Sequence, residues 1–317
     1  MEFVDLATEY CDLNVFNAES RNIIMWSAKL FDRRSRCFVE DLSPAAIAQF
    51  KKETLRRAKA VTYNGYLRYL RLLGDFGVEH GYLHKNWFRY AKTAPLEQPL
   101  PKVMSDNTMW QLVEYVAEKP NRCRPNWFWI AVIKTLYSTG IRRRQIVGIQ
   151  KQDVDFESRH LLLRANTSKT GREWCIPLHD SAIEAIQEVI ERSEEVLQRS
   201  LRPDEPIFNV CRFNRRYQPD DNNPEYMRAR SVTDFFKGVK SRTGLKVGAH
   251  RFRHTVATKL CNPAGKEVEP DIFGVQSLLG HTSVQTTRNY VQTSVTRLER
   301  LVDTLEIPAL MGRTLSR

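Results

Sequence analysis

Six residues in the last two thirds of the chain have side chains that suit chemistry at a phosphate group. The first follows a Thr-Gly-Ile run, the second lies in a Ser-Lys-Thr-Gly turn, and two more are three apart in HRFRHTVAT. Residues three apart share one helical face. The last two are a histidine after Leu-Gly and a tyrosine nine residues further on. These residues are Arg142, Lys169, His250, Arg253, His281 and Tyr290.

Taken singly, each residue has an ordinary structural explanation, but together the six could cleave and rejoin a phosphodiester. A phenol has a pKa of ~10 and attacks phosphorus only when a base helps to remove its proton. The two arginines would bind the non-bridging oxygens with forked donors that stay charged. Lys169 would protonate the departing sugar oxygen, and His250 would take the proton of Tyr290. His281 would donate a hydrogen bond to a phosphate oxygen.

Nothing in the sequence completes a metal or nucleotide site. His250 and His254 have the i, i+4 spacing of a helical zinc pair, but the HExxH glutamate is absent and no nearby Cys or Asp completes four ligands. The six cysteines are scattered without a CxxC pair, which is typical of reduced thiols. The chain contains no GxxxxGK[ST] motif. We therefore predict neither a metal nor a cofactor.

Composition favours a folded protein with an anionic partner. The 317 residues include 49 Lys plus Arg against 37 Asp plus Glu, a net charge of +12, and the pI is about 9.5. Such an excess is typical of proteins that bind nucleic acid. No run of 18 apolar residues occurs and the acidic amino terminus lacks the order of a signal peptide, so we expect no membrane association.

Two domains are expected, with a boundary in a proline-rich linker. Residues 1–94 form a helical domain, in which Ser43 and Pro44 are suited to begin a helix and 61–76 repeat apolar residues with a helical period. Residues 95–104 contain three prolines within seven positions and form the linker. Residues 105–317 form the second domain.

The second domain reads as mostly helical with one small antiparallel sheet. Ser105 is suited to cap a helix, and 127–137 are apolar on all sides and predict a central buried helix that ends at Gly140. Short β-prone segments within 147–178 predict two or three antiparallel strands. Residues 203–230 read as a loop without an assigned role. Further helices are expected at 181–199, 231–242, 250–261, 270–279, 283–292 and 295–306.

Two stretches have open interpretations. The basic run at 51–59 is either a solvated helix face or a strip that follows a phosphate backbone. The apolar stripe at 295–306 either folds back on its own domain or docks on a neighbouring protomer; we favour docking. The basic run contributes the candidate DNA-binding residues Lys51, Lys52, Arg56, Arg57 and Lys59.

The order Arg, Lys, H-x-x-R, L-G-H and Tyr resembles the tyrosine recombinases, or phage integrase family. The resemblance is carried by TGIRRRQIVGIQKQDVDF, SKTGREWCIPL, HRFRHTVATKL and LLGHTSVQTTRNY. It covers roughly 105–292, with a weaker likeness of 42–90 to the family's helical, SAM-like core-binding domain. The resemblance assigns the six catalytic roles to the six residues named above. This sequence departs from the family pattern at Gln145, where the family usually has a glutamate that supports the active site.

The resemblance implies a two-domain clamp around duplex DNA and a 3′-phosphotyrosyl intermediate that needs neither metal nor ATP. The partners it implies are recombination sites, four protomers on synapsed DNA, and accessory DNA-bending or directionality proteins. It also implies a cytoplasmic, nucleoid-associated protein of bacterial or phage origin. Two alternatives stay open: strand relaxation of the type IB topoisomerase kind, and a non-catalytic DNA-binding regulator. The sequence does not disclose the DNA target.

Overall fold

The computed structural model describes residues 1–97, 101–118, 123–168, 171–263 and 271–291. The chain divides into two compact units, Met1–Pro99 and Leu100–Arg317, each with its own buried core. Within the described ranges, no helix is long and apolar enough to cross a membrane.

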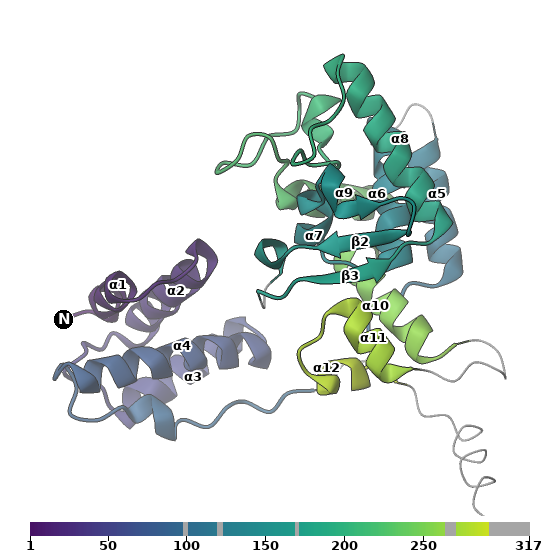
Figure 1. Ribbon diagram of the computed structural model, residues 1–317. Coiled ribbons are helices and arrows are strands. Elements are labelled where there is room, and N and C mark those ends of the chain that lie inside the picture. The colour runs from purple at the N-terminus through teal and green to yellow at the C-terminus, as the bar shows by residue number, and fades with distance from the viewer. Residues whose placement is uncertain (98–100, 119–122, 169–170, 264–270, 292–317) are drawn as a thin grey trace, which may run out of the picture. The chain divides into compact units, whose positions relative to one another are not determined.

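The first unit is entirely helical (Figure 1). Four buried phenylalanines from four different segments meet in its core, and the rings of Phe3, Phe31 and Phe88 pack edge to face. The predicted start at Ser43 and Pro44 is confirmed, because the Ser43 hydroxyl accepts the N–H of Ala46. The elements are α1 (Phe3–Leu13), α2 (Ala18–Ser35), α3 (Pro44–Arg57), α4 (Ala60–Glu79) and the 3-10 helix η1 (Trp87–Tyr90).

A long-range cap ties α1 to α2. The carboxylate of Asp32, near the end of α2, accepts the backbone N–H groups of Phe3 and Val4 at 2.9 Å each. These are orphan donors in the first turn of α1, where the helix dipole also favours a negative charge. These two hydrogen bonds therefore fix how α1 packs against α2.

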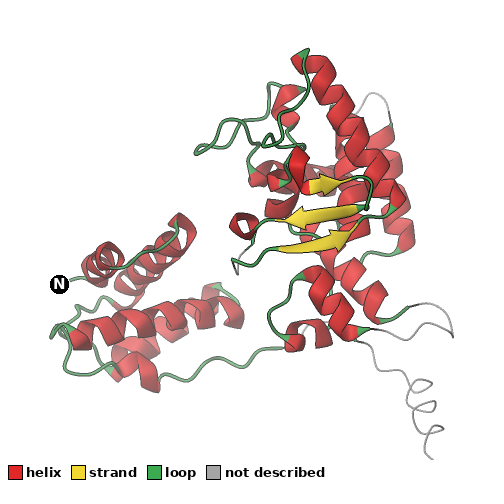
Figure 2. Ribbon diagram, viewed as in Figure 1, coloured by secondary structure: helices red, strands yellow, loops and turns green. Residues whose placement is uncertain are grey.

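The second unit packs helices around one three-stranded sheet (Figures 1 and 2). The strands are β1 (Val154–Asp155), β2 (His160–Leu163) and β3 (Trp174–Pro177), all antiparallel in the order β1-β2-β3. The predicted mainly helical fold with a small antiparallel sheet is confirmed. The helices are α5 (Asp106–Ala117), α6 (Asn126–Thr139), α7 (Arg143–Gly148), α8 (Asp180–Leu197), α9 (Ala229–Thr243), α10 (Ala249–Cys261), α11 (Ile272–Leu279) and α12 (Val284–Arg288).

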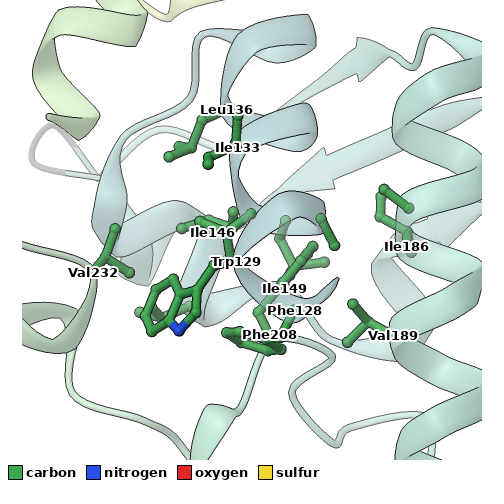
Figure 3. Packing of buried hydrophobic residues seen from close by; sticks show 14 of the residues in the cluster. Phe128, Trp129, Ile133, Leu136, Ile146, Ile149, Ile186, Val189, Phe208 and Val232 are labelled. Carbon is green, nitrogen blue, oxygen red and sulfur yellow. The ribbon is translucent and has the colours of Figure 1, made fainter. Parts of the chain in front are cut away.

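Helix α6 is the central element of this unit, as the sequence predicted. Phe128, Trp129 and Leu136 are completely buried, and α6 contacts α5, α7, α8 and α10. Figure 3 shows Phe128 and Trp129 close to Phe208 and to aliphatic side chains of α7 and α8. The ring of Trp129 stacks on Phe235 of α9 with centroids 4.0 Å apart. This core holds α6 and α7 rigidly beside α10.

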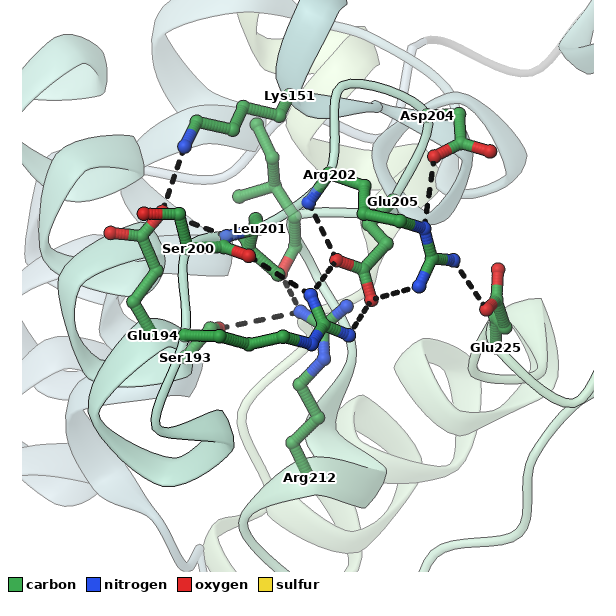
Figure 4. A network of polar contacts seen from close by, with 12 residues as sticks. Lys151, Ser193, Glu194, Ser200, Leu201, Arg202, Asp204, Glu205, Arg212 and Glu225 are labelled. Carbon is green, nitrogen blue, oxygen red and sulfur yellow. Dashed lines mark hydrogen bonds and ion pairs between the residues drawn. The ribbon is translucent and has the colours of Figure 1, made fainter.

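The loop before α9 is organised by a buried carboxylate (Figure 4). Glu205 is only 4% exposed and receives both guanidinium nitrogens of Arg199, at 2.7 and 2.8 Å. Arg202 pairs with Glu205 at 3.4 Å and with Glu225 at 2.6 Å. A short 3-10 helix, η4 (Val210–Arg212), follows within the same stretch. The segment predicted as a loop therefore has a fixed shape held by ion pairs.

Candidate active site

Arg142 lies where α6 ends and α7 begins. Gly140 terminates α6 in the left-handed conformation, with φ of 65°, and its N–H donates to the carbonyl of Leu136. A Cβ at Gly140 would lie 2.8 Å from the Leu279 side chain and 3.1 Å from that of Val256. Glycine therefore permits both the turn and the close approach of α10 and α11. Arg142 is the N-cap residue of α7.

The guanidinium of Arg142 is partly buried, and not all of its donors form hydrogen bonds with the described residues. Its Nη1 has no partner among the described residues, and burial lowers the pKa of this side chain. Gln145, which is buried, accepts the backbone N–H of Arg142 through Oε1 at 2.8 Å. The Nε2 of Gln145 also lacks a partner within the described ranges. The amide thus fixes the start of α7 but leaves the charge of Arg142 uncompensated.

Arg253 fastens two loops together from within α10. Its side chain is buried, with Nη1 donating to the Gly140 carbonyl at 3.1 Å and Nη2 to the Leu279 carbonyl at 2.7 Å. Burial, together with the smaller effect of the Arg142 charge, lowers the pKa of Arg253 to about 9. The two guanidinium groups therefore lie close enough to repel each other, and an anion between them would relieve both.

Tyr290 is buried next to these arginines. It packs against Ala257, Cys261 and Val275, and its carbonyl accepts a hydrogen bond from Asn262 Nδ2 at 2.8 Å. Burial raises the pKa of the phenol, whereas the charges of Arg253 and Arg142 act to lower it. The structure thus places the tyrosine in the field of both cations.

The helix expected at 283–292 is shorter than predicted. Helix α12 ends at Arg288, and Tyr290 lies in the turn that follows, with its N–H bonded to the Thr287 carbonyl. That bond spans three residues, as in a tightened last turn, so the helix does not continue through the tyrosine.

His281 faces the ring of Tyr290. The two rings are parallel to within 8°, with centroids 6.2 Å apart, and a 2.8 Å hydrogen bond joins His281 Nδ1 to Thr287 Oγ1. Burial and the charges of Arg253 and Arg142 lower the pKa of His281 to about 4.

A contact from the sheet supports the turn that carries His281. Trp174 of β3 donates from Nε1 to the Leu278 carbonyl at 3.2 Å, and a Cβ at Gly280 would lie 2.4 Å from the indole. Gly280 has a φ of 61°, so glycine is required there both by conformation and by space. The β2–β3 hairpin and the His281 turn are therefore in direct contact.

His250 lies at the start of α10 and is exposed. Partial burial of its ring, followed by the charges of Arg253, Arg142 and Lys102, lowers the pKa of His250. Its ring contacts that of His254, one turn further along α10, with centroids 4.4 Å apart.

The structure brings five of the six predicted catalytic residues into one cluster. Lys169 lies outside the described residues, so its role stays a prediction. Sequence reasoning considered His254 only as half of a zinc pair, yet its ring is 5.4 Å from that of Tyr290. No group of three or more His, Cys, Asp or Glu residues in the described part of the chain could hold a metal ion. The clustered residues are Arg142, His250, Arg253, His281 and Tyr290.

The five candidate DNA-binding residues belong to the first unit. Four of them lie on α3, and Lys59 is the N-cap residue of α4. Arg56 pairs with Glu53 at 2.9 Å and Arg57 approaches the same carboxylate at 3.8 Å, while Lys52 and Lys59 are exposed. Their contact with DNA stays a prediction.

Comparison with known proteins identifies the family. The sequence model of the Phage integrase family matches residues 102–297. Relatives named "Putative tyrosine recombinase XerC" occur in Pseudomonas aeruginosa and Pseudomonas syringae. They are 26% and 28% identical over 266 residues, which is 80% and 81% of this chain. The chain spans only 60% and 54% of the length of these two relatives.

A solved structure shares the fold. The Tn1549 transposon integrase, in complex with transposon right end DNA, matches with a TM-score of 0.70 and 16% sequence identity, covering 95% of this chain and 100% of that one. Because the family model matches more than half of the residues, and the motifs that it covers carry the clustered side chains, the chain belongs to the phage integrase family.

Proposed function

We propose that this chain is a site-specific DNA recombinase in which Tyr290 cleaves and rejoins DNA strands. The observation that carries the proposal is the convergence on a buried tyrosine of two guanidinium groups, Arg142 and Arg253, that form no ion pair with a carboxylate among the described residues. Guanidinium forks match the oxygens of a phosphodiester, and an unpartnered buried donor such as Arg142 Nη1 is satisfied when a phosphate oxygen enters.

The attack begins at the Tyr290 phenol. The scissile phosphorus would accept the phenolate oxygen while the bond to the 5′ sugar oxygen breaks, leaving a 3′-phosphotyrosyl link. The two arginines would stabilise the negative charge that gathers on the non-bridging oxygens. Lys169 would deliver the proton that the 5′ oxygen needs. A bound phosphate would add negative charge and so raise the pKa of nearby histidines, which makes them better proton acceptors.

Rejoining would reverse these steps with the 5′ hydroxyl of a partner strand. One phosphate ester is exchanged for another of similar energy, so the proposed reaction needs no ATP. His250 would accept the proton of the phenol during cleavage and return it to the tyrosine oxygen during rejoining. In both steps His281, which is anchored through Thr287, would donate a hydrogen bond to a phosphate oxygen.

The partners of the proposed reaction are duplex DNA and further copies of the chain. The Tn1549 integrase structure is a complex with transposon right end DNA, and the net charge of +12 suits a polyanion. We propose that residues 1–94 and 105–317 clamp the duplex from two sides and that 95–104 link them. The basic strip at 51–59 would bind the phosphate backbone, and 294–306 would dock on a neighbouring protomer in a tetramer.

The test is covalent capture of DNA. The chain is incubated with nicked, sheared genomic DNA from the organism that encodes it, and adducts that survive denaturation are quantified. Wild-type protein should form an adduct, and Tyr290→Phe should abolish it while retaining DNA binding. An adduct that persists in Tyr290→Phe would show that the nucleophile is a different residue.

A second assay separates the alternatives. Relaxation of a supercoiled plasmid without exchange between sites would favour topoisomerase activity over recombination. DNA binding without any adduct would favour a non-catalytic regulator.

A further inference from the structure

His254 is a polar residue of the site to which the proposed mechanism gives no task. Its Nδ1 is buried and has no hydrogen-bond partner among the described residues. A buried polar atom without a hydrogen bond destabilises a fold, and most buried polar atoms in proteins have a partner, so the exception at Nδ1 calls for an explanation. The missing partner of Nδ1 is therefore to be sought among the groups that surround the ring.

The ring of His254 contacts two candidate catalytic side chains. It lies 4.4 Å from the ring of His250 at an interplanar angle of 78°, and 5.4 Å from the ring of Tyr290 at 51°. Among the ring contacts of Tyr290 within the described ranges, this one is closer than that of His281, at 6.2 Å. Of these two histidines, His254 therefore has the ring centroid closer to that of Tyr290.

The surroundings keep His254 neutral. Partial burial comes first among the causes that lower its pKa to about 4, and the charges of His250, Arg253, Lys102 and Arg251 act in the same direction. A neutral imidazole has one nitrogen that donates and one that accepts. Of the groups that contact His254, the Tyr290 phenol is the one whose O–H must be oriented before the oxygen can attack.

We propose that His254 is a positioning residue for the nucleophile: before attack, its Nδ1 accepts the hydrogen bond of the Tyr290 phenol and orients that oxygen toward the scissile phosphate. The O–H then turns from His254 to His250 as the proton leaves. The inference rests on the proposed function, because it assigns a task to a residue of the same site. The hydrogen bond forms when the side chain of Tyr290 turns toward the DNA, and it supplies the partner that Nδ1 lacks in the DNA-free state.

Packing is the competing role, and three substitutions separate the two. His254→Phe keeps a ring but removes the acceptor, His254→Asn keeps a polar atom near the position of Nδ1, and His254→Gln moves that atom toward Nε2. The probe is nicked, sheared genomic DNA, and the readouts are the initial rate of adduct formation at saturating DNA and the amount of DNA retained without denaturation.

We expect the adduct rate to fall about tenfold in His254→Phe, which corresponds to about 1.4 kcal/mol, because the phenol is no longer held in place for attack. DNA retention should stay unchanged, and His254→Asn should keep the wild-type rate to within about threefold. A wild-type rate in His254→Phe, or equal losses in Phe and Asn, would overturn the proposal in favour of packing.

If His254→Phe does not fold, the Asn and Gln variants decide. The proposal requires Asn to react about tenfold faster than Gln, and equal rates would overturn it. Failure of the proposed function looks different, because the wild-type protein would then form no adduct or Tyr290→Phe would still form one.

Discussion

Replacement of Arg253 by lysine should destabilise the catalytic unit even though the positive charge is kept. The guanidinium donates to the carbonyls of Gly140 and Leu279 at 3.1 and 2.7 Å, in two directions at once. A lysine ammonium is a point charge that lacks the rigid fork, so it reaches one carbonyl and leaves the other buried and unpaired. The loss of one hydrogen bond to a charged group lowers the free energy of unfolding by about 2 kcal/mol.

Thermal unfolding, monitored by circular dichroism, measures this loss of stability. For a domain of this size, 2 kcal/mol corresponds to a fall in Tm of about 4–8 °C. Arg251→Lys is the matched control, since that side chain belongs to the same helix and forms no hydrogen bond between its guanidinium and the rest of the described chain. If Arg253→Lys melts with the wild type, or if Arg251→Lys falls as far, the two carbonyl contacts do not hold the loops as argued.

Two other predictions follow from the ion pairs and from the carboxyl-terminal segment. Arg199 and its neighbours lower the pKa of Glu205 from 4.5 to about 2, so this carboxylate contributes stability that is fully present above pH 4.5 and is lost as the pH falls toward 2. Glu205→Gln should therefore lower the free energy of unfolding by about 2 kcal/mol at pH 7, a figure reduced because the arginines are partly exposed to solvent, and by much less near pH 2. Urea unfolding at the two pH values measures both losses of stability, and equal losses would contradict the prediction. Deletion of 294–317 should preserve cleavage at a single site but weaken the pairing of two DNA sites in a gel-shift assay, and unchanged recombination by the truncated protein would refute protomer docking.

Local rules predicted the elements whose boundaries depend on their own residues. The hydroxyls of Ser43 and Ser105 cap α3 and α5, and Gly140 ends α6 with a positive φ, because caps and stops are decided within one turn. The three strands were also found, since β-prone segments and a turn lie close together in the sequence. The family motifs then indicated which side chains meet, and the structure places five of them in one cluster.

The features that sequence reasoning missed depend on distant partners. Asp32 caps a helix that begins 29 residues earlier. Glu205 is held by Arg199 and Arg202, and Arg202 also pairs with Glu225, further along the loop. Composition alone showed that 203–230 contains turn-forming residues, which does not reveal a buried carboxylate. His254 was considered only as half of a zinc pair, for which further ligands are absent, and its contact with Tyr290 was missed because the two residues are 36 positions apart in the sequence. Such contacts follow from packing and not from periodicity.

If Tyr290 is the nucleophile, as proposed, the burial and charges of the site give a physical reason for it to be inactive before DNA binds. Burial raises the pKa of Tyr290, and the nearby His254 and His281 have pKa values of about 4, so neither is a strong base in the free protein. Burial is the largest cause of both low histidine pKa values, and the charge of Arg253 lowers both of them as well. Under the proposed function, a phosphate bound between Arg142 and Arg253 would offset the part of the shift that comes from positive charge and so would raise the pKa values of the histidines. Binding of the substrate and activation of the tyrosine would then be one electrostatic event, which would tie the chemistry to the presence of DNA.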